Sequence, residues 1–202
     1  MTLVMLCIAL VCSAAVAGVY LLTKERIAQA EENKRTVAIG EVLPEFDGMT
    51  KESVEVNGES LEISIATKDS LVVGYAVESS VNGFGGPVTL MVGFDAEGVV
   101  TGVKVLKHSE TPGLGSLISE EDNVLLGSVL GHNPSKMNFK VRKDGGDVDA
   151  LTGATITSRA YIASVEKAFN AYLKQTTGAT TEGYSGASPV KATNKGRERR
   201  RK

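Results

Sequence analysis

The stretch VTLMVGFDAEGVVTGVKVL, residues 88–106, contains two strand-like patterns on either side of a polar turn. Valine and other apolar residues dominate both halves, which is typical of buried β-strands. Between them lies DAEG, residues 95–98, a polar tetrapeptide that ends in glycine. Two such runs joined by a short turn predict an antiparallel hairpin formed by Val88–Phe94 and Val99–Leu106.

The residues on either side of this hairpin extend the pattern. Leu61, Ile63 and Ile65 alternate with polar residues, which predicts a half-buried strand over Leu61–Ala66. Four further elements are expected: a strand over residues 71–77, a helix over Ser116–Leu130, a short strand over Met137–Val141 and a turn at residues 144–147.

After Thr157 the spacing of apolar residues changes from two to three and four. Ile162, Val165, Phe169 and Tyr172 recur at these helical intervals, so an amphipathic helix is expected. Strands followed by interspersed helices predict an α+β fold with a mainly antiparallel sheet.

Residues 1–23 contain no charged side chain. The apolar run from Thr2 to Leu22 would span about 30 Å as a helix, so we expect a single transmembrane anchor over residues 1–23. A cleaved signal peptide is the alternative, because Ala15-Val16-Ala17 resembles a cleavage site. The apolar run continues beyond that site, which favours the anchor. Large residues before Cys7 and Cys12 argue against a lipoprotein.

The remaining chain divides by composition into three parts. Residues 24–50 are expected to form a helical stalk or linker that Pro44 interrupts, and residues 51–175 the folded domain. Residues 176–202 carry seven Lys/Arg and two acidic residues with few large apolar ones, so a disordered basic tail is expected.

Composition excludes several classes of function. The body of the chain is acidic, so binding to the phosphate backbone of a nucleic acid is not expected. Trp is absent and aromatic residues make up 5%, so base stacking is not expected either. Nucleic acid is therefore not a predicted partner. The two cysteines both lie in the first apolar run. This chain alone therefore provides no disulfide framework, zinc site or iron–sulfur site.

Two glycine-containing segments are candidates for ligand binding. HSETPGLG, residues 108–115, predicts a tight loop whose glycines let backbone N–H groups approach a ligand, although an ordinary strand-to-helix turn has the same pattern. DALTGATITS, residues 149–158, places hydroxyl groups at a helix N-terminus, which suits an anion such as phosphate. A plain N-cap is the alternative, because Ser and Thr are ordinary capping residues.

These segments carry a resemblance to a known family. DALTGAT resembles the flavinylation motif Asp-x-x-Ser/Thr-Gly-Ala-Thr of covalent FMN-binding domains, in which the last Thr forms a phosphoester with FMN. HSETPGLG resembles a second signature of that domain, and GFGGP, residues 83–87, is also similar to it. With one N-terminal anchor and this length, the chain resembles the G subunits of Rnf electron-transport complexes. The C subunits of sodium-translocating NADH:quinone reductases share the motif but are usually longer.

The resemblance implies a covalent FMN on Thr155, attached by a separate flavin transferase with FAD as donor. Asp149 would be a recognition or activation residue for that step. A second TGAT at residues 177–180 has Lys174 at the position equivalent to Asp149 and no following amphipathic helix, so only Thr155 is expected to carry flavin. The other residues implied to contact FMN are Thr152, Gly153, Ala154, Thr157 and Ser158 in the first segment, and Glu110, Thr111, Gly113, Leu114 and Gly115 in the second.

Three aromatic or histidine residues have alternative roles. Tyr75 and Phe84 are expected to pack in the core rather than shield the flavin, whereas His108 is as consistent with a surface position as with a flavin contact. Catalytic acid–base residues and metal ligands are not expected, because flavin electron transfer depends on the position and environment of the cofactor.

The function implied is that of an electron-carrying subunit in an ion-translocating oxidoreductase that runs electrons between ferredoxin and NAD. Its partners would be the other subunits of the complex, of the Rnf A, B, C, D and E type. A free-standing surface flavoprotein and an anchored domain without redox function are alternatives. The resemblance implies a single-pass protein of the cytoplasmic membrane with the flavin domain on the extracytoplasmic side. Four basic residues after the anchor, Lys24, Arg26, Lys34 and Arg35, point to the opposite orientation.

Overall fold

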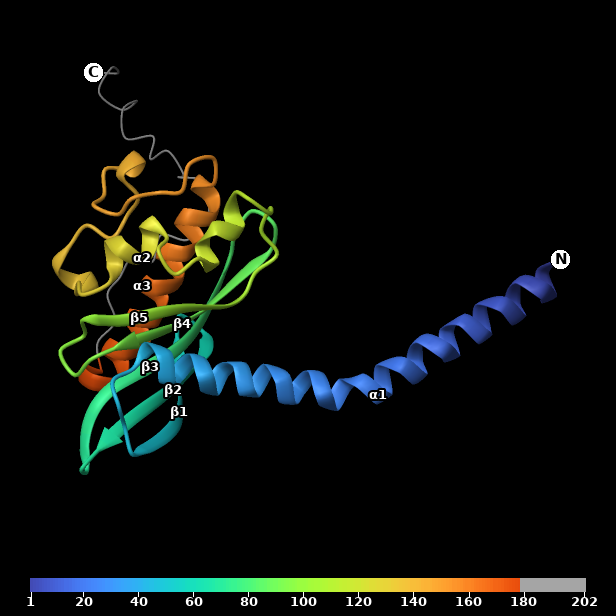
Figure 1. The fold of residues 1–202 in the computed structure, drawn as a ribbon, viewed down its shortest axis with the longest axis horizontal. Coiled ribbons are helices and arrows are strands. Elements are labelled where there is room, and N and C mark those ends of the chain that lie inside the picture. The colour runs from blue at the N-terminus through green and yellow to red at the C-terminus, as the bar shows by residue number, and fades with distance from the viewer. Residues whose placement is uncertain (179–202) are drawn as a thin grey trace, which may run out of the picture.

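In the computed structural model, which describes residues 1–178, a five-stranded sheet lies between two long helices (Figure 1). The strands form an antiparallel meander in the order β1-β2-β3-β4-β5. The predicted α+β fold is thereby confirmed. The long elements are α1 (Thr2–Val42), β1 (Gly48–Val56), β2 (Glu59–Lys68), β3 (Leu71–Asn82), β4 (Pro87–Phe94), β5 (Val100–Lys107) and α3 (Thr155–Thr177).

Short helices fill the connection between β5 and α3. They are α2 (Val124–Val129) and the 3₁₀ helices η1 (Gly115–Ser119), η2 (Pro134–Lys136) and η3 (Arg142–Asp144). The predicted disordered tail falls almost wholly outside the described residues, as do the last two residues of the second TGAT.

Each face of the sheet packs against a different helix. The side chains of Val77 and Val92 point into the main core, which α3 closes with Phe169 and Tyr172. The neighbouring positions in β3 and β4 point the other way, into a smaller cluster closed by the last turns of α1. The alternation follows from the two-residue period of a strand, and burial on both faces explains why the central strands are so rich in valine.

The end of α1 contacts the sheet through backbone atoms as well as side chains. Gly93 and Gly102 lie opposite each other in β4 and β5. A Cβ atom on Gly93 would lie 2.2 Å from the Val42 carbonyl oxygen, and one on Gly102 would lie 2.8 Å from Val42 Cα. The Thr101 hydroxyl donates a hydrogen bond of 2.6 Å to the same carbonyl. These two glycines are required because the helix backbone approaches so closely.

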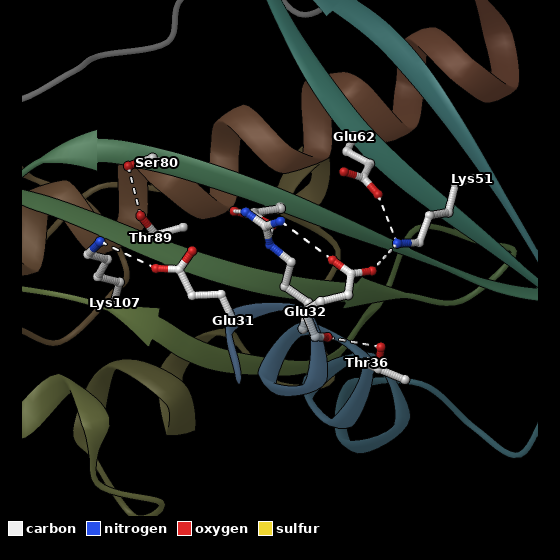
Figure 2. Close-up of polar contacts among 10 residues, drawn as sticks. Glu31, Glu32, Thr36, Lys51, Glu62, Ser80, Thr89 and Lys107 are labelled. Carbon is white, nitrogen blue, oxygen red and sulfur yellow. Dashed lines mark hydrogen bonds and ion pairs between the residues drawn. The ribbon is translucent and has the colours of Figure 1, made fainter. Parts of the chain in front are cut away.

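Ion pairs continue this contact along the preceding turns of α1 (Figure 2). Arg35 Nε lies 2.8 Å from Glu78 Oε2, and Lys107 Nζ lies 3.8 Å from Glu31 Oε1. On the other side of the helix, Lys51 pairs with Glu32 at 2.9 Å. Each such pair contributes at most about 1 kcal/mol where solvent reaches it. Together they fix how α1 lies on the sheet.

The N-terminal part of α1 stands clear of the domain with its side chains exposed. Among the described residues it is the one helix long and apolar enough to cross a membrane. The hydroxyl groups of Ser13 and Thr23 donate to carbonyl oxygens four residues earlier, at 2.7 and 2.9 Å. Such bonds satisfy polar groups without water, as a helix in lipid requires.

Two local predictions differ from the structure, and one strand has no counterpart among the predicted elements. The expected single helix over Ser116–Leu130 is wrong, because a turn separates η1 from α2. In that turn the Asn123 side chain accepts a hydrogen bond of 2.8 Å from Leu126 N and so caps the start of α2. The expected strand over Met137–Val141 is also wrong: among the described residues it forms only an isolated bridge between Val141 and Val148. Strand β1 is not predicted by the sequence pattern, since only Val54 and Val56 of its residues are buried.

Candidate functional site

The side chain of Glu110 joins the three segments that carry the sequence motifs. One carboxylate oxygen, Oε1, accepts hydrogen bonds from the backbone N–H groups of Phe84 (2.9 Å) and Gly85 (3.2 Å). The other, Oε2, accepts a bond of 2.7 Å from the Thr157 hydroxyl at the start of α3. Glu110 is 6% exposed. This carboxylate therefore fixes the β3–β4 turn, the loop after β5 and α3 relative to one another.

Gly115 is needed for this arrangement. A Cβ atom at this position would lie 2.7 Å from Glu110 Oε2 and 2.8 Å from Thr157 Oγ1. Both atoms belong to the same buried hydrogen bond, so any larger residue would displace it. The glycine in the motif thus serves the contact between loop and helix.

The N-terminus of α3 lacks a side-chain cap, since its N-cap residue is Ala154. The first intrahelical bond runs from Ser158 N to the Ala154 carbonyl (2.9 Å), so the N–H groups of residues 155–157 have no carbonyl partner within the helix. The preceding Gly153 has φ +77°, a left-handed backbone conformation that directs the chain into the first turn of the helix. Free N–H groups and the positive end of the helix dipole make this terminus suited to phosphate.

A pocket with a volume of about 380 Å³ opens at this terminus. Its size is within the range of about 300–1,000 Å³ usual for cofactor sites. Thr155 lines it together with ten other residues. The apolar ones include Phe84, Leu114 and Ile156, and Lys143 contributes a cation; the remaining lining residues are Glu110, Thr111, Gly115, Gly153, Ala154 and Thr157. Apolar walls for a ring system and a positive N-terminus for a phosphate fit FMN.

The structure brings eight of the twelve predicted site residues to this pocket and leaves four outside its lining. Ser158 is buried and holds the motif loop, because its hydroxyl accepts from Leu151 N at 3.0 Å and donates to the Ala154 carbonyl at 2.9 Å. Thr152 is exposed, and Gly113 forms a turn in which its N–H donates to Ser116 Oγ.

The fourth residue outside the lining, Asp149, pairs with Arg142 at 2.7 Å. Arg142 belongs to η3, the turn that also contains Lys143. On the other side of Lys143, both oxygens of Asp144 accept hydrogen bonds of 2.7 Å from the Arg159 guanidinium. The guanidinium lowers the pKa of the Asp144 carboxyl by hydrogen bonding to its charged form.

The aromatic residues are placed differently from the sequence-based expectation. The sequence predicts Phe84 in the core, but it is 70% exposed and lines the pocket, because the tight turn after β3 turns it outward. Tyr75 packs edge-on against Tyr172 with ring centroids 5.2 Å apart, as a core residue would. His108 lies outside the pocket lining, and its Nδ1 accepts a hydrogen bond from Glu110 N at 3.2 Å. Sequence reasoning misses Lys143, because no motif in the sequence marks it.

Comparison with known proteins gives two family matches. Residues 83–170 match the FMN-binding domain, and residues 2–42 match the RnfG N-terminal region. The first match contains all three motif segments described above. The second covers α1 to its last residue.

Several relatives and one solved structure are similar to this chain. The G subunit of the ion-translocating oxidoreductase complex of Pasteurella multocida is 37% identical over 173 residues, which cover 79% of this chain and 86% of the relative. The protein of the same name from Vibrio cholerae is 35% identical, with 82% and 86% covered. The crystal structure of the C subunit of the Na(+)-translocating NADH-quinone reductase from Parabacteroides distasonis is 23% identical with a TM-score of 0.42, over 69% of this chain and 79% of that one.

Identity above one third, over most of both chains, accompanies a pocket whose residues fit FMN. The match to the RnfG N-terminal region covers the membrane-type helix, and the match to the FMN-binding domain covers the pocket-lining residues from Phe84 to Thr157. This chain therefore belongs to the G-subunit family of ion-translocating oxidoreductase complexes.

Proposed function

We propose that this chain is the electron-carrying flavoprotein subunit of a membrane complex that couples electron transfer between ferredoxin and NAD to ion translocation. In this proposal its FMN is linked through a phosphoester to Thr155. The observation that carries the proposal is the position of Thr155 as the first residue of an uncapped helix, inside a pocket suited to FMN. When bound, FMN supplies electron transfer, and the chain supplies its position and surroundings.

The linkage requires a transferase outside this chain. Thr155 Oγ would attack the phosphorus of the FMN half of FAD; the new O–P bond forms, the bond between the two phosphates breaks, and AMP leaves. The hydroxyl proton must pass to a base, since a neutral Thr hydroxyl is a poor nucleophile. Glu110 is the one carboxylate among the lining residues, and both of its oxygens already accept hydrogen bonds. The base is therefore expected on the separate flavin transferase.

The second TGAT provides a matched control for the attachment site. The full chain is expressed with its flavin transferase, and fluorescence of the protein band is measured on a denaturing gel. We expect Thr155→Ala to abolish the fluorescence and Thr180→Ala to retain it. Thr155 is only partly buried, so the loss of its hydroxyl should change stability by no more than about 0.5 kcal/mol. A fluorescent Thr155→Ala band would refute the assignment.

The partners in this proposal are the other membrane subunits of an Rnf-type complex. The names of the relatives, which are those of complex subunits, support it. Purification in mild detergent should recover this chain together with other membrane subunits. A free-standing flavoprotein of the cell surface would instead elute alone with its flavin attached.

The flavin domain is placed on the extracytoplasmic side in this proposal, in agreement with the family resemblance and against the local charge bias. Glu121 offers a labelling site because its side chain is 94% exposed. In a chain with Cys7 and Cys12 replaced by alanine, Glu121→Cys should react in intact cells with a membrane-impermeant maleimide. Reaction only after lysis would reverse the orientation.

A further inference from the structure

The three consecutive charged residues of η3 lie beside the flavin motif, the pocket and α3. Arg142 Nε lies 2.7 Å from Asp149 Oδ1, at the first residue of the flavin motif. Asp144 binds Arg159, four residues beyond Thr155 on α3, through two hydrogen bonds of 2.7 Å. Lys143 lies between these two contacts and lines the pocket with Thr155. The turn is thus tied to the flavin motif on one side of Lys143 and to α3 on the other.

The backbone of this turn is also held. Arg142 N donates to the Val148 carbonyl (2.9 Å), and Asp144 N donates to the Val141 carbonyl (2.8 Å). These bonds accompany the bridge between Val141 and Val148. The backbone at Lys143 is therefore fixed, and only the Lys143 side chain can change its conformation to meet a ligand.

The acidic residues near Lys143 are each engaged by a different group. Asp144 is paired with Arg159, and Asp149 with Arg142. Glu110 directs its oxygens to two backbone N–H groups and a hydroxyl. Among the ion pairs of the described residues, Asp144 and Asp149 pair with arginines, and Lys143 acts on Asp144 only as one of the smaller Coulomb contributions that lower its pKa. This cation is therefore available to an anion that enters the pocket.

We propose that Lys143 binds the phosphate of FMN together with the free N–H groups at the start of α3. Asp149 is a positioning residue in this arrangement: it holds Arg142, and thereby the turn that carries Lys143, rather than activating the Thr155 hydroxyl. The inference rests on the proposed binding of FMN in this pocket. The Arg142–Asp149 pair is well exposed, so it contributes little to folding. Its contribution is to the position of the turn.

Binding of free flavins to the full chain tests the role of Lys143. In detergent and without transferase, the Thr155→Ala chain is titrated with FMN and with riboflavin, which lacks the phosphate. Lys143→Gln should weaken FMN binding about tenfold, equivalent to about 1.4 kcal/mol, and leave riboflavin binding unchanged. Lys143→Arg should retain most of the FMN affinity. Lys136→Gln removes an exposed lysine outside the pocket and should have no effect.

The positioning role of Asp149 is tested by a double-mutant cycle. Asp149→Asn should weaken FMN binding about threefold when Lys143 is present and not at all in the Lys143→Gln chain. An equal loss in both backgrounds would show that Asp149 acts independently of Lys143. That result would overturn the positioning role.

A second measurement uses the covalently loaded protein. The ³¹P resonance of the phosphoester should shift in Lys143→Gln and stay in place in Lys136→Gln. Unchanged FMN affinity together with an unchanged resonance would overturn the inference while the proposed attachment to Thr155 stands. Absence of flavin on the unmodified chain would instead refute the proposed function.

Discussion

Replacement of Glu110 by alanine removes the acceptor of three hydrogen bonds that join the motif segments. The Thr157 hydroxyl would lose its partner in a fully buried position, at a cost of about 1–3 kcal/mol. The N–H groups of Phe84 and Gly85 are only partly buried, so each would add about 0.5–1 kcal/mol. The sum is about 2–5 kcal/mol. In a domain of this size we expect the melting temperature to fall by roughly 10 °C.

Near-ultraviolet circular dichroism of the full chain in detergent suits this measurement, because the packed rings of Tyr75, Phe94 and Tyr172 report on the core. Glu110→Gln keeps one oxygen for the two N–H groups, so it should cost only about 1 kcal/mol. Glu121→Ala, at an exposed glutamate, is the matched control. A Glu110→Ala variant that melts within about 2 °C of the unmodified chain would contradict the claim that this carboxylate holds the site together.

Three further predictions concern two contacts of α1 with the sheet and one ion pair between η3 and α3. Arg35→Ala should lower the free energy of unfolding by about 1 kcal/mol at low salt, because it removes the partly buried ion pair with Glu78. Salt screens the part of this pair that solvent reaches, so the loss should be smaller at high salt, which denaturant titration at two salt concentrations measures. Gly102→Val should cost about 1–3 kcal/mol and expose the end of α1 to limited proteolysis, since its side chain would meet the backbone of Val42. Arg159 lowers the pKa of the Asp144 carboxyl in the folded protein. The stability that this pair contributes is therefore present above the unfolded-state pKa and is lost as the pH falls through the lowered, folded-state pKa. Asp144→Asn should destabilise the domain near neutral pH and not in strong acid, and thermal melts at these two pH values would show the difference.

The strands predicted most accurately are those buried on both faces. The hairpin over residues 88–106 differs from β4 and β5 by one residue at its ends, because apolar residues recur through both strands and the polar DAEG turn separates them. Strand β1 has two buried residues near its end, so its sequence gives little periodic signal. Hydrophobic pattern therefore predicts the centre of this sheet and not its edge.

The candidate site divides in a similar way. The sequence suffices to predict a place at the site for Thr155, Gly153 and Gly115. Each of these residues lies in a motif that is continuous along the chain. Lys143 lies twelve residues before Thr155, and a loop with an isolated bridge between Val141 and Val148 brings it to the pocket. Such a contact depends on how a loop folds back, which local spacing does not encode.

The direction of α1 relates the pocket to the apolar segment. Val42 lies against Gly102, and eleven residues earlier Glu31 pairs with Lys107, so α1 runs alongside β5 towards the end of that strand (Figure 1). The loop that follows β5 lines the pocket. The helix therefore leaves the domain at the end of the sheet where the pocket lies. Between Leu22 and Glu31 the helix is only about 14 Å long. The apolar contacts and the ion pairs of α1 therefore place the pocket and the membrane-type segment at the same end of the sheet.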